Sequence, residues 1–357
     1  MIHLREHFQT ENAPGIERSE THLCSPYPQG AAQRPSIRCR RNSLAAYISG
    51  FGVKPADRHT GSWPADTLQW QNVQYQFRSF VMIIDFRVRA PFAAYASSPL
   101  FTRADMVEQD TMTRTDTPMS PSAKQFSLDL LMREAEEAGV DRMVVPLRRA
   151  AGGRNEDLAA LLAAYPDKLI GLAGIDVTDI RRAVEETEKF VVNGPCRGIV
   201  MEPGQDMTPW FVNSAWAFPL YAYCQEHGVP IAFTFGGIMT RSLRYYAPEL
   251  IDDVAAAFPG LNIALVHGGW PHVTQVCQIA LNRRNVYLVP DIYMVRSPGM
   301  ADYVMAANYL LRERVIFASA YPILPLREAR DAYMGCGLRD EVKPLIMGEN
   351  AARFLNL

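Results

Sequence analysis

The sequence of 357 residues has no long apolar run, few cysteines and almost no excess of charge. No stretch approaches the roughly 18 consecutive apolar residues that a membrane-spanning helix needs. The N-terminus lacks the charged, apolar and small-residue order of a secretory signal. The formal net charge is −2, from 36 Lys and Arg against 38 Asp and Glu, which argues against a broadly basic nucleic-acid binder. We therefore expect neither a membrane nor a nucleic acid as a partner.

The six cysteines are scattered along the chain, and no two of them form a Cys-x-x-Cys pair. This spacing argues against a disulfide framework or a zinc knuckle, so we expect a reducing, cytoplasmic location. Apolar residues make up 48% of the chain and charged residues 21%, which is ordinary globular usage. A chain of this length can bury the core of one large α/β domain or of two smaller domains.

The composition changes near residue 82. Residues 1–81 carry a charge of +3, from 9 basic and 6 acidic residues, whereas the remainder carries −5, from 27 and 32. The first segment also holds six prolines and no sustained apolar period. Such a segment cannot bury enough apolar surface to order itself. We interpret residues 1–81 as a disordered N-terminal extension and residues 82–357 as the folded domain.

From residue 81 onward, short apolar runs alternate eight times with helical stretches, apart from a long polar loop expected over residues 90–122. Runs that are apolar throughout are typical of strands buried on both faces of a parallel sheet. Eight such units predict an α/β fold, a (β/α)8 TIM barrel. The alternative is a doubly wound open sheet, which normally has a glycine-rich turn after its first strand, and none follows here. The runs are 81–86, 143–146, 169–175, 198–201, 230–234, 263–267, 286–289 and 315–318.

A shortened chain that begins at Met82 is expected to fold on its own, because the regular pattern of apolar runs starts there. Its thermal unfolding, followed by calorimetry, should be as cooperative as that of the full chain. A loss of cooperative unfolding in the shorter chain would show that residues 1–81 pack on the barrel.

In a TIM barrel the reacting groups lie at the carboxyl ends of the strands. Arg87 and Arg89 project to the same side of an extended segment, because side chains there alternate with period two. Two guanidinium groups suit an anion held by paired hydrogen bonds. Alternatively, they form a structural ion-pair network with nearby carboxylates. The strand-end residues are Asp85, Arg87, Arg89, Arg148, Arg149, Asp176, Glu202, Thr234, Phe235, His267, Asp291, Tyr293, Ser319 and Tyr321.

His267 ends a buried run and precedes two glycines, which allow the backbone to approach a ligand closely. As the one imidazole at a strand end, it is our candidate for general acid–base catalysis near neutral pH. Asp291 and Glu202 are the candidate carboxylates that assist it. The alternative is that His267 is a packed, hydrogen-bonded core residue.

Three aromatic residues near the strand ends are candidates for substrate binding: Trp270, Tyr293 and Tyr321. Trp270 and Tyr293 have planar faces on which a ligand can stack, and the Tyr321 hydroxyl can assist proton transfer. The alternative for each ring is packing in the core.

Four segments resemble the amidohydrolase-related family: residues 83–89, 266–271, 317–322 and 348–355. That family includes aminocarboxymuconate semialdehyde decarboxylase, related aromatic-acid decarboxylases, oxalomesaconate hydratase and pyrone-dicarboxylate lactonase. The resemblance spans about residues 82–357. It implies a distorted TIM barrel with its site at the C-terminal mouth, and the activity of a hydrolase or a carbon–carbon lyase.

The family's usual metal ligands are replaced in this sequence. After the first strand the family usually has His-x-His, where this chain has Arg87 and Arg89. The usual histidine of the fifth strand is replaced by Thr234 or its neighbour Phe235, and the usual aspartate of the eighth by Ala320. Only His267 matches. Because arginine stays protonated and only donates hydrogen bonds, we predict no metal and no other cofactor.

These observations favour a metal-independent hydrolase or lyase, of decarboxylase or lactonase type, acting on a small carboxylate-bearing substrate. Arg87 and Arg89 would hold the acid and stabilise developing negative charge, while His267 moves the proton. The alternatives are a catalytically silent ligand-binding barrel and a metal enzyme with rearranged ligands. The sequence leaves open the substrate, the bond cleaved and whether the chain forms a homo-oligomer.

Overall fold

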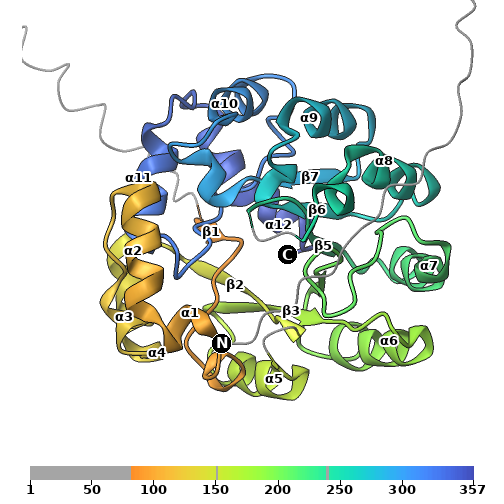
Figure 1. Cartoon of the computed structure of the whole chain (residues 1–357), viewed down its shortest axis with the longest axis horizontal. Coiled ribbons are helices and arrows are strands. Elements are labelled where there is room, and N and C mark those ends of the chain that lie inside the picture. The colour runs from red at the N-terminus through yellow and green to blue at the C-terminus, as the bar shows by residue number, and fades with distance from the viewer. Residues whose placement is uncertain (1–81, 150–151, 239–240) are drawn as a thin grey trace, which may run out of the picture. The chain divides into compact units, whose positions relative to one another are not determined.

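Residues 82–149, 152–238 and 241–357 are described here from a computed structural model. The predicted disorder of residues 1–81 therefore lies outside the described residues. The described strands form one parallel sheet in which each strand pairs with the next along the chain, and helices surround the sheet (Figure 1). This arrangement confirms the predicted TIM barrel. The strands are β1 (Ile84–Asp85), β2 (Arg142–Pro146), β3 (Leu169–Gly174), β4 (Gly198–Met201), β5 (Ile231–Thr234), β6 (Ile263–Val266) and β7 (Val286–Val289).

The strands are apolar throughout because both of their faces are buried. Alternate residues such as Val144 and Val200 fill the inside of the barrel, whereas their neighbours Met143 and Ile199 pack under the outer helices. Phe354 also lies in the inner cluster, with its ring 5.4 Å from that of Phe86. The interior of the barrel is thus filled with side chains.

The predicted eighth strand is irregular. Residues 315–321 make two isolated bridges, Leu288 with Val315 on one side and Val88 with Tyr321 on the other. Backbone hydrogen bonds connect this segment to both neighbours, since the Ile316 amide donates to the Leu288 carbonyl over 2.9 Å and the Phe86 amide donates to the Phe317 carbonyl over 3.1 Å. The segment therefore closes the barrel between β7 and β1 without forming a regular strand.

The prediction of a long polar loop over residues 90–122 is wrong, because most of this segment is helical. It contains η1 (Ala93–Tyr95), α1 (Pro99–Thr102), α2 (Ala104–Thr115) and α3 (Pro121–Lys124). Two Ser-Pro pairs start α1 and α3, and in each pair the serine hydroxyl caps the first turn by accepting from a backbone amide. Serine before the first turn and proline at its start are both helix-start signals. They identify these helices in the sequence even though no sustained apolar period does.

The remaining helices follow the strands as predicted. Gly139, at a φ of +65°, ends α4 where the sequence indicated. Within the described ranges, none of the helices is long and apolar enough to cross a membrane. They are α4 (Leu128–Ala138), α5 (Asn155–Ala164), α6 (Ile180–Thr187), α7 (Phe218–Glu226), α8 (Pro248–Ala257), α9 (Val273–Asn282), α10 (Met300–Asn308), α11 (Leu326–Gly335) and α12 (Asn350–Phe354), with short η3 (Glu188–Val192), η4 (Ala215–Ala217), η5 (Leu243–Tyr246), η6 (His267–Gly269), η7 (Asp291–Met294) and η8 (Leu345–Glu349).

Candidate active site

A cavity of about 320 Å³ opens at the carboxyl ends of the strands. Three arginines, one histidine and one tyrosine come to it from strand ends, and α1 and α2 contribute apolar side chains. This is the position at which TIM-barrel enzymes carry their reacting groups. The lining residues are Arg87, Arg89, Pro99, Leu100, Arg103, Met106, Val107, Asp110, Arg114, Arg148, Gln205, Ile238, His267, Ile292, Tyr293, Ala320 and Ile323.

A fully buried carboxylate, Asp291, connects His267 to Arg87. His267 Nδ1 lies 3.0 Å from Asp291 Oδ2, and Arg87 Nη1 donates to the same oxygen over 3.1 Å. An ionised carboxylate only accepts hydrogen bonds, so Nδ1 carries the hydrogen. The other ring nitrogen, Nε2, has no hydrogen-bond partner among the described residues, and His267 lines the cavity. The imidazole is thereby oriented with Nε2 left for a ligand.

The charge states of this pair follow from their surroundings. Burial lowers the pKa of His267, and the nearby arginines lower it further, although Asp291 acts in the opposite direction. Burial alone would raise the pKa of the Asp291 carboxyl, but His267 and the arginines outweigh it and bring that pKa below its ordinary value. At neutral pH the pair therefore consists of a neutral imidazole and an ionised carboxylate, the arrangement that a general base requires.

The backbone around this pair adopts uncommon conformations. His267, Asp291 and Ala320 have φ angles of +70°, +43° and +58°, the left-handed region that residues other than glycine seldom occupy. Gly237, at a φ of +87°, lies so close that an added Cβ would be 3.0 Å from the His267 ring and 3.1 Å from the Tyr293 hydroxyl. Strained positions of this kind cluster at functional sites.

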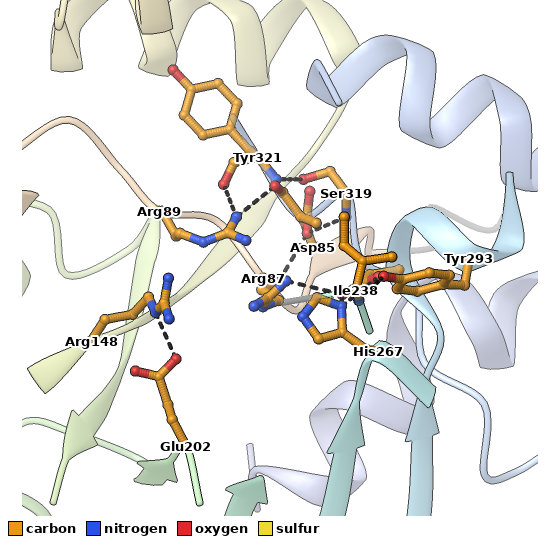
Figure 2. A network of polar contacts seen from close by, with 12 residues as sticks. Asp85, Arg87, Arg89, Arg148, Glu202, Ile238, His267, Tyr293, Ser319 and Tyr321 are labelled. Atoms are coloured by element: carbon orange, nitrogen blue, oxygen red, sulfur yellow. Dashed lines mark hydrogen bonds and ion pairs between the residues drawn. The ribbon is translucent and has the colours of Figure 1, made fainter. Parts of the chain in front are cut away.

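The other two strand-end arginines of the cavity are held differently. Arg89 Nη1 donates to the carbonyls of Ala320 and Tyr321, over 2.6 and 2.7 Å. Arg148 Nε donates to Glu202 Oε1 over 2.6 Å (Figure 2). Its Nη2 donates to Gln205 Oε1 over 2.8 Å. The predicted catalytic residue Glu202 thus contacts Arg148 and not His267.

Asp85 holds the strand ends together. Its Oδ1 accepts from the backbone amides of Arg87 and Ser319, over 3.1 and 2.9 Å, so it ties β1 to the closing segment. Burial raises the pKa of this carboxyl, although the Ser319 and Arg87 hydrogen bonds act against that rise. Asp85 lies outside the lining of the cavity, so it supports the arginines without facing a ligand.

The three predicted aromatic residues lie in different places. Tyr293 lines the cavity, and its hydroxyl accepts from the Ile238 amide over 3.0 Å. Trp270 lies behind Tyr293, stacked on its ring at 4.9 Å, so it supports that ring from outside the lining. The Tyr321 ring points away from His267 and the arginines (Figure 2), and its hydroxyl is 2.7 Å from Ser122 Oγ. The expectation that the Tyr321 side chain contacts substrate is therefore replaced by a role for its backbone carbonyl, which accepts from Arg89.

Comparison with known proteins identifies the family. The sequence model of the family described as "Amidohydrolase" matches residues 118–357, about two thirds of the chain. The chain belongs to the amidohydrolase family. An uncharacterised TIM-barrel protein from Bordetella bronchiseptica has 33% identity over 77% of this chain and 98% of its own, with a TM-score of 0.73.

Amidohydrolase-like decarboxylases share the fold at lower identity. 5-Carboxyvanillate decarboxylase from Sphingomonas paucimobilis has 16% identity over 78% of this chain and 99% of its own, with a TM-score of 0.57. A dihydroxybenzoic acid decarboxylase from a Polaromonas species, with bound manganese and the inhibitor 2-nitroresorcinol, has 16% identity over 77% of this chain and 97% of its own, also with a TM-score of 0.57. At these identities the likeness concerns the fold.

The residues at the strand ends of this amidohydrolase do not fit a metal ion. Where the family resemblance implies ligands, Arg87 and Arg89 present guanidinium groups, which only donate, and Ala320 has no donor atom. His267 Nδ1 is already turned to Asp291. No group of three or more His, Cys, Asp or Glu side chains in the described ranges could hold a metal ion. The donor set therefore argues against a divalent cation at this site.

We expect the purified protein to hold well below one zinc or manganese ion per chain, because the guanidinium groups of Arg87 and Arg89 repel a cation where ligands are needed. Elemental analysis by mass spectrometry measures the metal content. Treatment with a chelator should leave any turnover unchanged. One tightly bound transition-metal ion per chain, or activity lost on chelation and restored by metal, would contradict the expectation.

Proposed function

We propose that this amidohydrolase-family protein is a metal-independent hydrolase or lyase, of decarboxylase or lactonase type, acting on a small carboxylate-bearing substrate. The observation that carries the proposal is the connected set of His267, Asp291 and Arg87 beside a cavity to which Arg89 and Arg148 bring two further guanidinium groups from strand ends. An oriented neutral imidazole next to clustered positive charge suits a reaction in which a proton moves and negative charge develops.

The charge balance of the cavity supports an anionic substrate. Asp291 is the counter-ion of Arg87, and Glu202 is the counter-ion of Arg148. Arg89 makes its hydrogen bonds to backbone carbonyls, and its buried Nε has no partner among the described residues. Burial, followed by repulsion from Arg87 and Arg148, lowers the pKa of Arg89. A bound carboxylate would supply the missing negative charge and accept hydrogen bonds from the free N–H groups of Arg89.

The chemistry then needs one proton transfer at His267 Nε2. In hydrolysis, Nε2 takes a proton from the water that attacks the acyl carbon, and the resulting imidazolium returns it to the leaving oxygen or nitrogen. In decarboxylation, Nε2 first takes a proton from solvent water and then donates it to the carbon atom from which CO2 departs. In both cases the arginines stabilise the negative charge that develops on the substrate, without reorganising during the reaction. Glu202 contributes by holding Arg148 in place.

We expect Arg89→Ala and Arg87→Ala to weaken carboxylate binding by roughly ten- to hundredfold each, since one charge-assisted contact typically contributes about 1.5–3 kcal/mol. Isothermal titration calorimetry on the full chain, with benzoate and acetate as probes, measures this. Arg181→Ala is the matched control, because Arg181 is exposed and pairs only with Glu185 on its own helix. Arg89 has no carboxylate partner among the described residues, so Arg89→Ala should lower the thermal stability only through the loss of its two hydrogen bonds to the Ala320 and Tyr321 carbonyls.

Two results would count against the proposal. If both variants unfold readily while keeping their affinity for carboxylates, the arginines form a structural network. If carboxylates bind through the arginines but a panel of carboxylic acids, esters and lactones shows no turnover, the barrel binds ligands without catalysis. In the second case His267→Asn would change affinity alone.

A further inference from the structure

The cavity has two chemically distinct zones. Arg87, Arg89 and Arg148 lie at its floor, on the strand ends. Above them is an apolar collar, which we define as Pro99, Leu100, Met106, Val107, Ile238, Ile292 and Ile323. Ligand pockets commonly combine an apolar wall with a few placed polar groups, and the wall contacts the body of the ligand.

We propose that the substrate of this site is an amphipathic carboxylate, whose acid group lies on the arginines and whose apolar body extends through the collar to α2. This rests on the proposed function, since the arginines hold the acid, and it adds the chemical class of the rest of the substrate. The cavity has a volume of about 320 Å³. One carboxylate fills only a small part of it.

The exposure of the collar supports this occupant. The side chains of Met106 and Ile238 are 58% and 46% exposed although both line the cavity. Apolar surface gathered at the mouth of a pocket is stabilised when a ligand covers it. Of the charged residues beside the collar, Asp110 and Arg114 pair with each other over 3.0 Å, and Arg103 also lines the cavity.

The position of α2 is fixed at its other end. Thr111 and Thr115 are buried under the helix, and their hydroxyls are satisfied by carbonyls one turn earlier. Arg296 Nη1 donates to the carbonyl of Thr115 over 3.0 Å, which ties the end of α2 to the segment after β7. The first turns of the helix therefore hold Met106 and Val107 at the cavity. Both α1 and α2 precede residue 118, where the family match begins, so the part of the collar that these two helices supply lies outside the matched region.

The test is a titration of the full chain with acetate, butyrate, hexanoate and octanoate. Affinity should rise about fourfold with each added methylene that the collar buries, until the chain reaches the rim. Hexylammonium has the same apolar body with a positive head and should not bind. In Met106→Gln the octanoate affinity should fall at least about threefold while the acetate affinity stays unchanged. Met112→Gln is the matched control, because Met112 is exposed on the same helix outside the lining.

The outcomes separate this inference from the proposed function. Carboxylates that bind through the arginines with an affinity independent of chain length would overturn the apolar body and leave the carboxylate site intact. A rise with chain length that persists in both Met106→Gln and Leu100→Gln would also overturn it, since the body would then lie elsewhere. The absence of arginine-dependent binding for every carboxylate would instead remove the proposed function.

Discussion

Replacing His267 by asparagine is expected to lower turnover by roughly 10²–10⁴-fold, the usual loss when a general acid–base group is removed. The asparagine amide can still donate to Asp291, so the ion pair of Asp291 with Arg87 should persist. Substrate affinity should change little, because the carboxylate is held by the arginines. Single-turnover kinetics and calorimetry on the same samples separate the two effects.

The pH dependence gives an independent readout of this residue. Because burial and the arginines lower the pKa of His267, kcat/KM for a base-catalysed reaction should be constant near neutrality. It should fall only as the pH drops through a value below about 6.5, the ordinary pKa of histidine. The asparagine variant should lack this fall in kcat/KM at low pH, which is the acid limb of the pH profile. A charged imidazole would instead have shifted the limb above that value.

His227→Asn is the control, because His227 is exposed and its Nδ1 contacts only the carbonyl of Tyr223 in its own helix. Its turnover should match the parent. A His267→Asn turnover within about threefold of the parent would contradict the assignment and direct attention to Glu202.

The sequence predicted the barrel because its strands are buried on both faces, so their apolar runs stand out from the helices between them. It did not predict the irregular closing segment at residues 315–321, since an apolar run has the same composition whether it pairs regularly or at two bridges. It also missed α2, whose apolar residues do not follow a helical period, although the preceding serine–proline start of α1 was readable.

The floor of the site was partly predictable. Strand ends point to the mouth of a barrel, which brought Arg87, Arg89 and His267 to one cavity. The sequence could not distinguish Arg148, which lines the cavity, from Arg149, which pairs with Glu186 on α6. That choice depends on how the loop after β2 turns. The sequence did not predict the collar either, because its residues come from separate segments that together span more than 200 residues.

Replacing Asp291 by alanine is expected to produce the largest combined loss, in stability and in turnover together. The fully buried carboxylate is the counter-ion of Arg87, and breaking a buried pair on one side typically costs about 3–5 kcal/mol. The same carboxylate fixes the hydrogen of His267 on Nδ1, so its loss frees the imidazole to adopt the other tautomer. Urea unfolding measures the first effect, and turnover under folding conditions measures the second.

The pH dependence of stability tests the same carboxylate. Its pKa in the folded protein is below its ordinary value, because His267 and the arginines outweigh burial. The parent should therefore keep this contribution above about pH 4, the ordinary pKa of aspartate, and lose it as the pH falls through the lower folded value. Asp291→Asn keeps the shape of the side chain without the charge. Its free energy of unfolding should differ most from the parent near pH 6 and least in strong acid. If the difference in free energy of unfolding between the variant and the parent does not shrink on acidification, Asp291 acts by its shape. That result would contradict its role as the electrostatic partner of Arg87 and His267.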